Sequence, residues 1–159
     1  MPIVNNVTRL LDSKKIPYQP YELPVEKLGA DETARLLGVD PELVYKTIVV
    51  NRLKGKPILA VIPGPHRVDL KLLAAVLGEK KVSLPTEREA EQLTGLQAGG
   101  ISPLALVNKG FLVLIAVEAK SLSEIHVSGG QRGLNVRIPV SSLAELVRAR
   151  FAAISILDS

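Results

Sequence analysis

The sequence predicts a mixed α/β or α+β fold, organised as one domain over residues 1–159. Short runs rich in β-branched residues alternate with segments of helical periodicity, and most of the helical segments have capping residues at their ends. Two pairs of strand-like runs are each joined by a glycine-containing turn, which is the pattern of β-hairpins and excludes an all-parallel sheet. The 159 residues are 47% hydrophobic, which is enough to bury a substantial core.

The chain begins with a predicted amphipathic helix ahead of Pro17. Its apolar residues recur at helical spacing: Val4, Val7, Leu10 and Leu11. Residues 18–23 then predict an extended or edge strand, because their proline cannot donate to a central ladder. Residues 24–30 are expected to form a loop.

Capping residues predict two short helical segments next. Asp31 is the expected N-cap of a helix over residues 32–37, and Gly38 supplies the left-handed residue that ends it. Asp40 followed by Pro41 repeats the signal of a cap and a first-turn proline, so another brief helical turn is expected there.

A hairpin and a helix make up the middle of the chain. Residues 44–50 and 58–63 are rich in β-branched residues and are separated by a Lys-Gly-Lys turn, which favours an antiparallel pair. Asp69 is the expected cap of a helix that continues through Leu77 and ends at Gly78.

A short strand over residues 81–84 precedes the next helix. Thr86 and Glu89 form a capping box, so the helix is expected to begin there and to reach Leu93. Residues 111–117 are the most apolar run of the chain and are predicted to form the central strand.

The C-terminal part predicts a second hairpin and a last helix. Residues 124–128 and 134–138 flank a glycine-rich turn. Ser142 and the glutamate three residues later form a capping box for a helix expected to run through Phe151. Residues 154–157 are expected to close the fold as a final strand.

Composition excludes several classes of function. The 20 Lys and Arg against 16 Asp and Glu give a net charge of +4, too mild for a protein that wraps duplex DNA. Five aromatic residues without tryptophan do not favour a base-stacking RNA platform. The absence of cysteine excludes disulfides, thiolate metal sites and a cysteine nucleophile. No signal pattern or bilayer-length apolar run occurs, so a cytoplasmic protein without membrane contact is expected.

The sequence contains no recognisable set of catalytic side chains of the kind that common hydrolases use. The two histidines do not fit a triad: His66 falls in a predicted loop, where a surface role is expected, and His126 falls in a strand, where a structural role is expected. No G-x-S-x-G elbow, Walker loop or dinucleotide fingerprint is present. No metal and no cofactor are therefore expected.

Two glycine-rich segments are the main candidates for chemistry. We call residues 94–103, which contain Thr94 and the string Gly99-Gly100-Ile101-Ser102-Pro103, the first glycine loop, and residues 127–133 the second glycine loop. Glycine allows another molecule to approach the backbone closely. Either both segments are turns between strands, or together they build a site from backbone N–H groups.

Lys46 is the other candidate, because it falls within an otherwise apolar strand. The ammonium either extends to solvent from the sheet margin or points into a cavity. The sequence alone favours the first alternative, because lysines are seldom buried.

The combination of these motifs resembles the YbaK/aminoacyl-tRNA-synthetase-associated domain family. The resemblance rests on Tyr45-Lys46-Thr47 in a strand, on Gly99 to Pro103, and on Ser128-Gly129-Gly130 followed by Arg132. It covers nearly the whole chain. It implies a mixed, mostly antiparallel sheet that curves towards a barrel with helices around it. The family includes trans-editing deacylases and the editing insert of bacterial prolyl-tRNA synthetases, and its members hydrolyse the ester that links a wrong amino acid to tRNA.

The resemblance also implies roles for single residues. The residues expected to carry catalysis are Lys46, Gly99, Gly100, Ile101 and Ser102. The residues expected to line the substrate site are Tyr21, Leu28, Thr47, Thr94, Pro103, Ser128, Gly129, Gly130 and Arg132, with Tyr18 as the alternative to Tyr21. Leu28 stands where relatives carry phenylalanine, and Ser142 falls where some cysteine-specific members carry aspartate. Both departures concern the choice of amino acid.

The resemblance therefore predicts that the protein is a trans-editing deacylase of misacylated tRNA. The expected substrate is cysteinyl-tRNA(Pro). Alanyl-tRNA(Pro) is the alternative within the same class. A module that binds the 3′ end of tRNA or a synthetase without catalysis is the alternative from another class, and a structural subunit is the third. Prolyl-tRNA synthetase is a possible partner, since the mild charge predicts weak affinity for tRNA alone.

Overall fold

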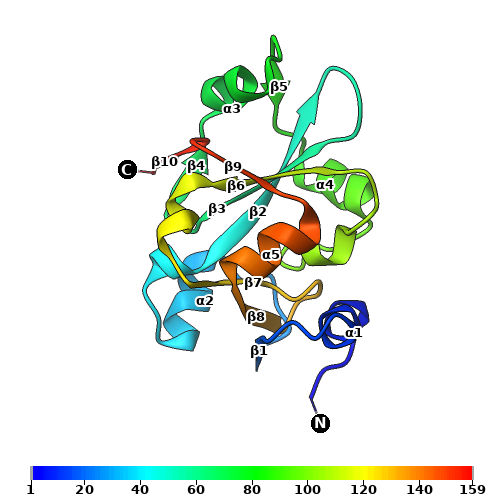
Figure 1. Cartoon of the computed structure of the whole chain (residues 1–159), viewed down its shortest axis with the longest axis vertical. Coiled ribbons are helices and arrows are strands. Elements are labelled where there is room, and N and C mark those ends of the chain that lie inside the picture. The colour runs from blue at the N-terminus through cyan, green and yellow to red at the C-terminus, as the bar shows by residue number, and fades with distance from the viewer. Residues whose placement is uncertain (1, 159) are drawn as a thin grey trace.

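Three β-sheets surrounded by helices make up the fold, which confirms the mixed α/β prediction (Figure 1). The computed structural model describes residues 2–158. The α-helices are α1 (Asn6–Ser13), α2 (Ala30–Leu37), α3 (Leu70–Leu77), α4 (Glu87–Thr94) and α5 (Val140–Val147). Short 3-10 helices lie at η1 (Pro41–Leu43), η2 (Pro103–Leu106) and η3 (Val117–Ser121). The strands are β1 (Gln19–Glu22), β2 (Tyr45–Arg52), β3 (Ile58–Pro63), β4 (His66–Val68), β5 (Val82–Ser83), β6 (Leu112–Ala116), β7 (Glu124–Ser128), β8 (Leu134–Pro139), β9 (Arg150–Ala152) and β10 (Ser155–Leu157).

The largest sheet has the strand order β5-β2-β3-β6-β9. The pairs β2–β3 and β2–β5 are antiparallel, and the pairs β3–β6 and β6–β9 are parallel. The middle strand is therefore β3, and the prediction that residues 111–117 form it was wrong. Every residue of β3 is buried, because helices or other strands cover both of its faces.

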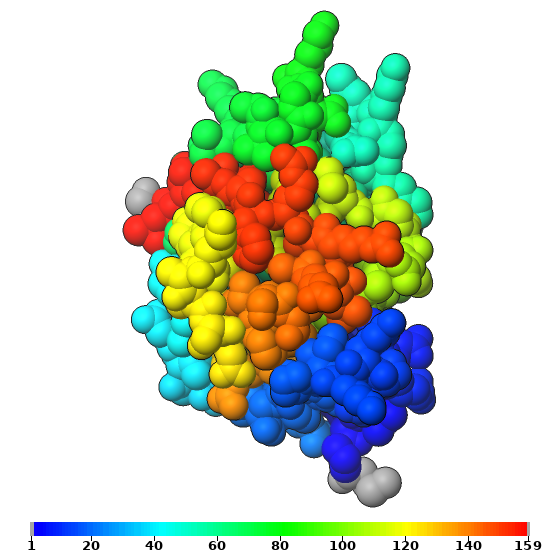
Figure 2. Space-filling model, viewed as in Figure 1, coloured from blue at the N-terminus to red at the C-terminus, as the bar shows by residue number. Residues whose placement is uncertain are grey.

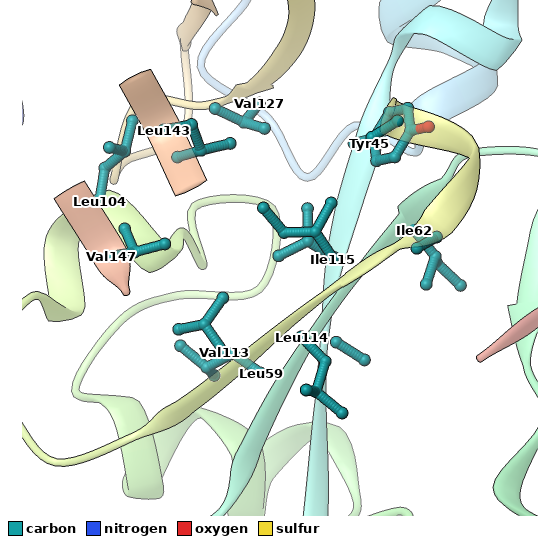
Figure 3. Close-up of a cluster of buried hydrophobic side chains, with 14 of the residues drawn as sticks. Tyr45, Leu59, Ile62, Leu104, Val113, Leu114, Ile115, Val127, Leu143 and Val147 are labelled. Carbon is teal, nitrogen blue, oxygen red and sulfur yellow. The ribbon is translucent and has the colours of Figure 1, made fainter. Parts of the chain in front are cut away.

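The core lies between this sheet and α5. Figure 3 shows Leu59 of β3 and Val113 and Ile115 of β6 on the side of the sheet that faces Leu143 of α5. All four side chains are at most 5% exposed. Burial of each such side chain stabilises the fold by about 1.5–3 kcal/mol, so this contact fixes the position of the sheet against the helix.

Two smaller sheets complete the structure. The first is antiparallel with the order β1-β8-β7, and the second pairs β4 with β10. A parallel bridge between Val44 and His126 joins β7 to the start of β2. The three sheets do not merge into one closed barrel, although most strand pairs are antiparallel, as the resemblance implied.

Local capping signals predicted most helix ends. The side chain of Asp69 accepts a hydrogen bond from Leu72 N, and Thr86 forms the expected capping box with Glu89. Two predictions were wrong. Helix α2 begins one residue before Asp31 with Gly29 as N-cap, and α5 begins two residues before Ser142 without a side-chain cap.

The C-terminal helix also ends earlier than predicted. Arg148 has φ of 55° in the left-handed region and ends α5, so residues 150–152 form β9 in place of the last helical turn. Arginine at a left-handed C-cap gives no sequence signal of the kind that glycine gives. No helix within residues 2–158 is long and apolar enough to cross a bilayer.

Candidate active site

A pocket of about 210 Å³ lies where the start of β2 meets both glycine loops. The segment between β1 and α2 forms one wall of this pocket, and the start of β8 forms another. Its lining residues are Leu23, Glu26, Leu28, Gly29, Ala30, Thr33, Val44, Tyr45, Lys46, Thr47, Gly99, Ile101, Ser128, Gly133, Leu134 and Asn135. The bridge between Val44 and His126 holds β7 beside β2 and so brings these walls together.

Six of the predicted site residues line this pocket: Leu28, Lys46, Thr47, Gly99, Ile101 and Ser128. They come from four separate parts of the sequence. The fold therefore brings together the lysine, one residue on either side of Gly100, and the serine of the second glycine loop.

Lys46 is partly buried in this pocket. Burial lowers the pKa of its ammonium, and Asp158 and Asp31 oppose that effect through their negative charges. Within residues 2–158 no carboxylate lies close enough to form an ion pair with Lys46. The ammonium is therefore available for an anionic or hydroxyl-rich ligand.

The backbone amides of the first glycine loop differ in what they bind. Gly100 N donates to the carbonyl oxygen of Gln97 at 2.8 Å and closes a tight turn. For Gly99 N and Ile101 N, the part of the chain that the structure describes offers no acceptor. Gly99 has φ of 91°, a conformation that glycine adopts without strain. Of the three amides, those of Gly99 and Ile101 are therefore unpaired within residues 2–158, and both residues line the pocket.

The two glycine loops pack directly against each other. A Cβ atom on Gly100 would lie 2.8 Å from Cα of Gln131, so only glycine allows this approach. Arg132 Nε donates to the carbonyl oxygen of Ala98 at 2.7 Å and joins the loops a second time. Arg132 does not line the pocket and acts here as a link between its walls.

The remaining predicted residues also lie outside the pocket lining. Ser102 is fully buried, and its hydroxyl caps η2 by accepting from Leu104 N. Thr94 is buried at the end of α4, where its hydroxyl donates to Ala90 O. Pro103 is the first residue of η2.

Three further predicted residues support the second loop and its sheet. Gly129 N donates to Leu134 O, and a Cβ on Gly130 would lie 2.9 Å from the Val7 side chain of α1. Tyr21 packs its ring against the His126 ring at 5.5 Å between centroids. These contacts hold the β7–β8 turn in place beside the pocket.

His126 is buried in β7, as predicted for a structural histidine. Its Nδ1 lies 2.9 Å from Asn135 Oδ1, and burial lowers the pKa of the ring. Asn135 is 5% exposed and lines the pocket, and sequence reasoning missed it. Asn135 and Arg137 are both polar residues of β8, so no local signal in the sequence distinguishes Asn135 as a pocket residue.

His66 does not have the predicted surface position. It is 8% exposed in β4, with Nδ1 3.1 Å from Ser155 Oγ and Nε2 3.1 Å from Glu42 Oε1. The pairing of β4 with β10 buries the ring, and the two sequence segments are far apart. The prediction of an exposed loop was therefore wrong, since local prolines and glycine concealed a strand.

Comparison with known proteins identifies the family. Residues 26–146 match the family described as the aminoacyl-tRNA editing domain. The chain belongs to this family. A protein of Enterococcus faecalis that is provisionally named Cys-tRNA(Pro)/Cys-tRNA(Cys) deacylase EbsC is 36% identical over 94% of this chain and 92% of its own length. The editing-domain match includes most of the pocket lining.

Further similarities are found to a ligase and to two solved structures. A proline–tRNA ligase of Thermodesulfovibrio yellowstonii is 29% identical over 59% of this chain, a region that makes up 16% of that ligase. The crystal structure of a protein provisionally described as a trans-editing enzyme for prolyl tRNA synthetase superposes with a TM-score of 0.80 and 22% identity, over 98% of this chain and 99% of that chain. A hypothetical protein superposes with a TM-score of 0.87 and 24% identity, over 96% and 100% of the two chains. At these identities the two structures support the fold.

Proposed function

We propose that this protein hydrolyses the ester bond of misacylated tRNA in trans, with cysteinyl-tRNA(Pro) as its main substrate. The observation that carries the proposal is the pocket, because Lys46 lines it together with Gly99 and Ile101. The name of the Enterococcus faecalis relative supports the choice of amino acid and tRNA. The proposed place of action is the cytoplasm, where tRNA is aminoacylated.

The proposed mechanism uses backbone amides as its main catalytic groups. The ester carbonyl lies against the first glycine loop, and Gly99 N and Ile101 N donate to its oxygen as negative charge develops. One well-placed donor of this kind lowers the barrier by about 3–4 kcal/mol. The Lys46 ammonium binds the phosphate or hydroxyl groups of the terminal adenosine and so positions the ester.

Two nucleophiles are compatible with this arrangement. A water oxygen can bond to the carbonyl carbon while the bond to the ribose oxygen breaks and that oxygen takes the proton. With a cysteinyl substrate, the thiol of the substrate can attack its own carbonyl carbon, and the ribose oxygen leaves with the thiol proton. Water then opens the thiolactone. Because neither route needs a nucleophile or a metal from the protein, we propose metal-independent hydrolysis, and EDTA is expected to leave the rate unchanged.

The size and lining of the pocket favour a small amino acid. Leu28, Val44, Ile101 and Leu134 provide apolar wall surface around a volume of about 210 Å³. One methylene changes binding by about 1–3 kcal/mol in such a pocket. Selection by size alone admits alanine as well as cysteine, so alanyl-tRNA(Pro) is the substrate to test beside cysteinyl-tRNA(Pro).

The test is a deacylation assay on a panel of aminoacyl-tRNAs. Cysteinyl-tRNA(Pro), alanyl-tRNA(Pro), prolyl-tRNA(Pro) and cysteinyl-tRNA(Cys) are each incubated with the wild type, Lys46→Ala and Lys46→Arg. Lys14→Ala is the matched control, because Lys14 is an exposed lysine outside the pocket. We expect cysteinyl-tRNA(Pro) to be hydrolysed fastest and prolyl-tRNA(Pro) to be spared. Lys46→Ala is expected to lose at least a hundredfold in kcat/KM, and Lys14→Ala is expected to match the wild type.

A binding module without catalysis is the second candidate. The match to part of a proline–tRNA ligase favours it, because a synthetase partner could supply the chemistry. It predicts that no substrate of the panel is hydrolysed while tRNA or prolyl-tRNA synthetase is still bound. Hydrolysis of any misacylated tRNA that depends on Lys46 rules it out.

A further inference from the structure

A group of cations gathers at the end of β2 opposite the pocket. We call it the hairpin patch, and it consists of Arg52, Lys54, Lys56, Lys80, Lys81 and Lys109. In Figure 2 the green segment around α3 and β5 and the turquoise β2–β3 turn project side by side from the top of the molecule. All of these cations except Arg52 are exposed.

Specific contacts hold the three contributing segments together. Arg52 pairs with Val82 in the antiparallel register of β2 and β5, so Lys80 and Lys81 lie next to the β2–β3 turn. The Lys56 ammonium lies 5.2 Å from the centre of the Phe111 ring. The Lys56 side chain also passes close to Gly110, because a Cβ atom added to Gly110 would lie 3.3 Å from Lys56 Cδ. Lys109 is therefore brought to the same end of the molecule.

The charge of the hairpin patch is almost unopposed. Arg52 Nε lies 3.8 Å from Glu79 Oε1. None of the five lysines of the patch has an ion-pair partner within residues 2–158. Six cations against one adjacent carboxylate exceed the net charge of +4 of the whole chain. The remainder of the chain therefore carries a slight excess of acid, and the positive charge is concentrated at one end.

The hairpin patch and the pocket lie along the same sheet edge. Strand β5 pairs with the outer edge of β2, and the chain then continues from β5 into α4. At the start of α4, Glu87 forms an ion pair with Lys27, which lies between the pocket residues Glu26 and Leu28. Lys46 and Arg52 are six residues apart in β2, which corresponds to about 20 Å.

We propose that the hairpin patch binds phosphates of the acceptor stem of tRNA while the 3′ end occupies the pocket. This inference rests on the proposed function. A terminal adenosine with its amino acid does not extend 20 Å from Lys46, so the patch contacts nucleotides further back in the chain. Lysines separated along a surface neutralise phosphates without reading sequence, so the contact adds affinity for tRNA in general and leaves the choice among tRNAs to other contacts.

The test compares a full tRNA with a fragment that is too short to reach the patch. Cysteinyl-tRNA(Pro) and a cysteinyl ester of the trinucleotide CCA are assayed with the wild type and with Lys54→Glu/Lys81→Glu. The matched control is Lys14→Glu/Arg148→Glu, which reverses the same charge at a second pocket between α1 and α5. Binding of uncharged tRNA is measured in parallel by fluorescence anisotropy over a series of salt concentrations.

The patch variant is expected to raise KM for the full tRNA at least tenfold with kcat unchanged, and to leave the trinucleotide reaction unchanged. The slope of log Kd against log salt concentration is expected to fall by about two for two lost phosphate contacts. Equal losses in the control variant, or a patch variant with wild-type affinity for tRNA, would overturn the inference, and the second result would favour an acidic protein as the ligand. If no substrate is hydrolysed, the proposed function fails, and the anisotropy series still decides whether the patch binds tRNA.

Discussion

The contact between the two glycine loops makes Gly100→Ala the most informative single substitution. An alanine Cβ would lie 2.8 Å and 3.0 Å from Cα and C of Gln131, and 3.1 Å from Arg132 N. Carbon atoms in contact prefer about 3.5–4.0 Å, so the second loop must move by roughly 0.7 Å. All three neighbours are backbone atoms, and rotation of a side chain cannot relieve the contact. Overpacking of this kind costs about 1–3 kcal/mol.

The substitution is expected to impair activity more than stability. A shift of about 1 Å in a positioning element can reduce the rate a hundredfold. Urea unfolding measures the free energy of unfolding, and the deacylation assay measures kcat/KM. Gly29→Ala is the control for stability, because a Cβ there meets nothing within 4 Å and φ is −75°; its expected cost is about 0.5 kcal/mol. Wild-type unfolding and wild-type kcat/KM for Gly100→Ala would refute the idea that the loops are rigidly packed.

Three further predictions concern ionisable groups that are buried or partly buried. Because burial lowers the pKa of Lys46, kcat/KM is expected to fall as the pH rises through that lowered pKa. The Lys46→Arg variant is expected to show this fall at higher pH. All rates are corrected for the uncatalysed hydrolysis of the ester. Burial also lowers the pKa of His126, so the unfolded chain binds more protons below pH 6.5. The free energy of unfolding is therefore highest above pH 6.5 and decreases as the pH falls from 6.5 to the lowered pKa of His126. Urea unfolding of His126→Gln is expected to depend less on pH in this range. The Tyr45 hydroxyl is buried, with no hydrogen-bond partner within residues 2–158, and burial raises its pKa. Tyr45→Phe is expected to raise the free energy of unfolding by about 1 kcal/mol, and a loss of stability would contradict this.

Elements with local signals were predictable, and elements that depend on distant partners were not. The capping box at Thr86 needs only residues three positions apart, so sequence reasoning found it. Strand β4 exists because β10 pairs with it, and no local pattern near His66 indicates that partner. The start of α5 was missed for a related reason: Val140 N donates to Ser123 O, which lies outside the helix. Local capping chemistry therefore did not determine where this helix begins.

The candidate site shows the same division. Lys46 stood out as a charge in an apolar strand, and the glycine strings stood out as unusual backbone, so both could be found from sequence. Asn135 could not be assigned to the pocket, because its position depends on the pairing of β7 with β8 and on the bridge to Val44. Glu26 and Thr33 line the pocket for a similar reason, since the segment between β1 and α2 folds over the start of β2.

The structure also divides roles within a string that the sequence presents as one motif. Ser102 is fully buried as the cap of η2, and Gly100 gives its amide to Gln97 while its α-carbon lies against the second loop. These two residues fix the path of the chain, and that path leaves the amides of Gly99 and Ile101 without an acceptor in the described part of the chain. An amide held in this way needs no reorganisation when charge develops on a ligand, which is the condition for strong electrostatic stabilisation. In the proposed mechanism, the buried residues of the motif are therefore as necessary as those that line the pocket, because they hold the proposed donors in place before a substrate binds.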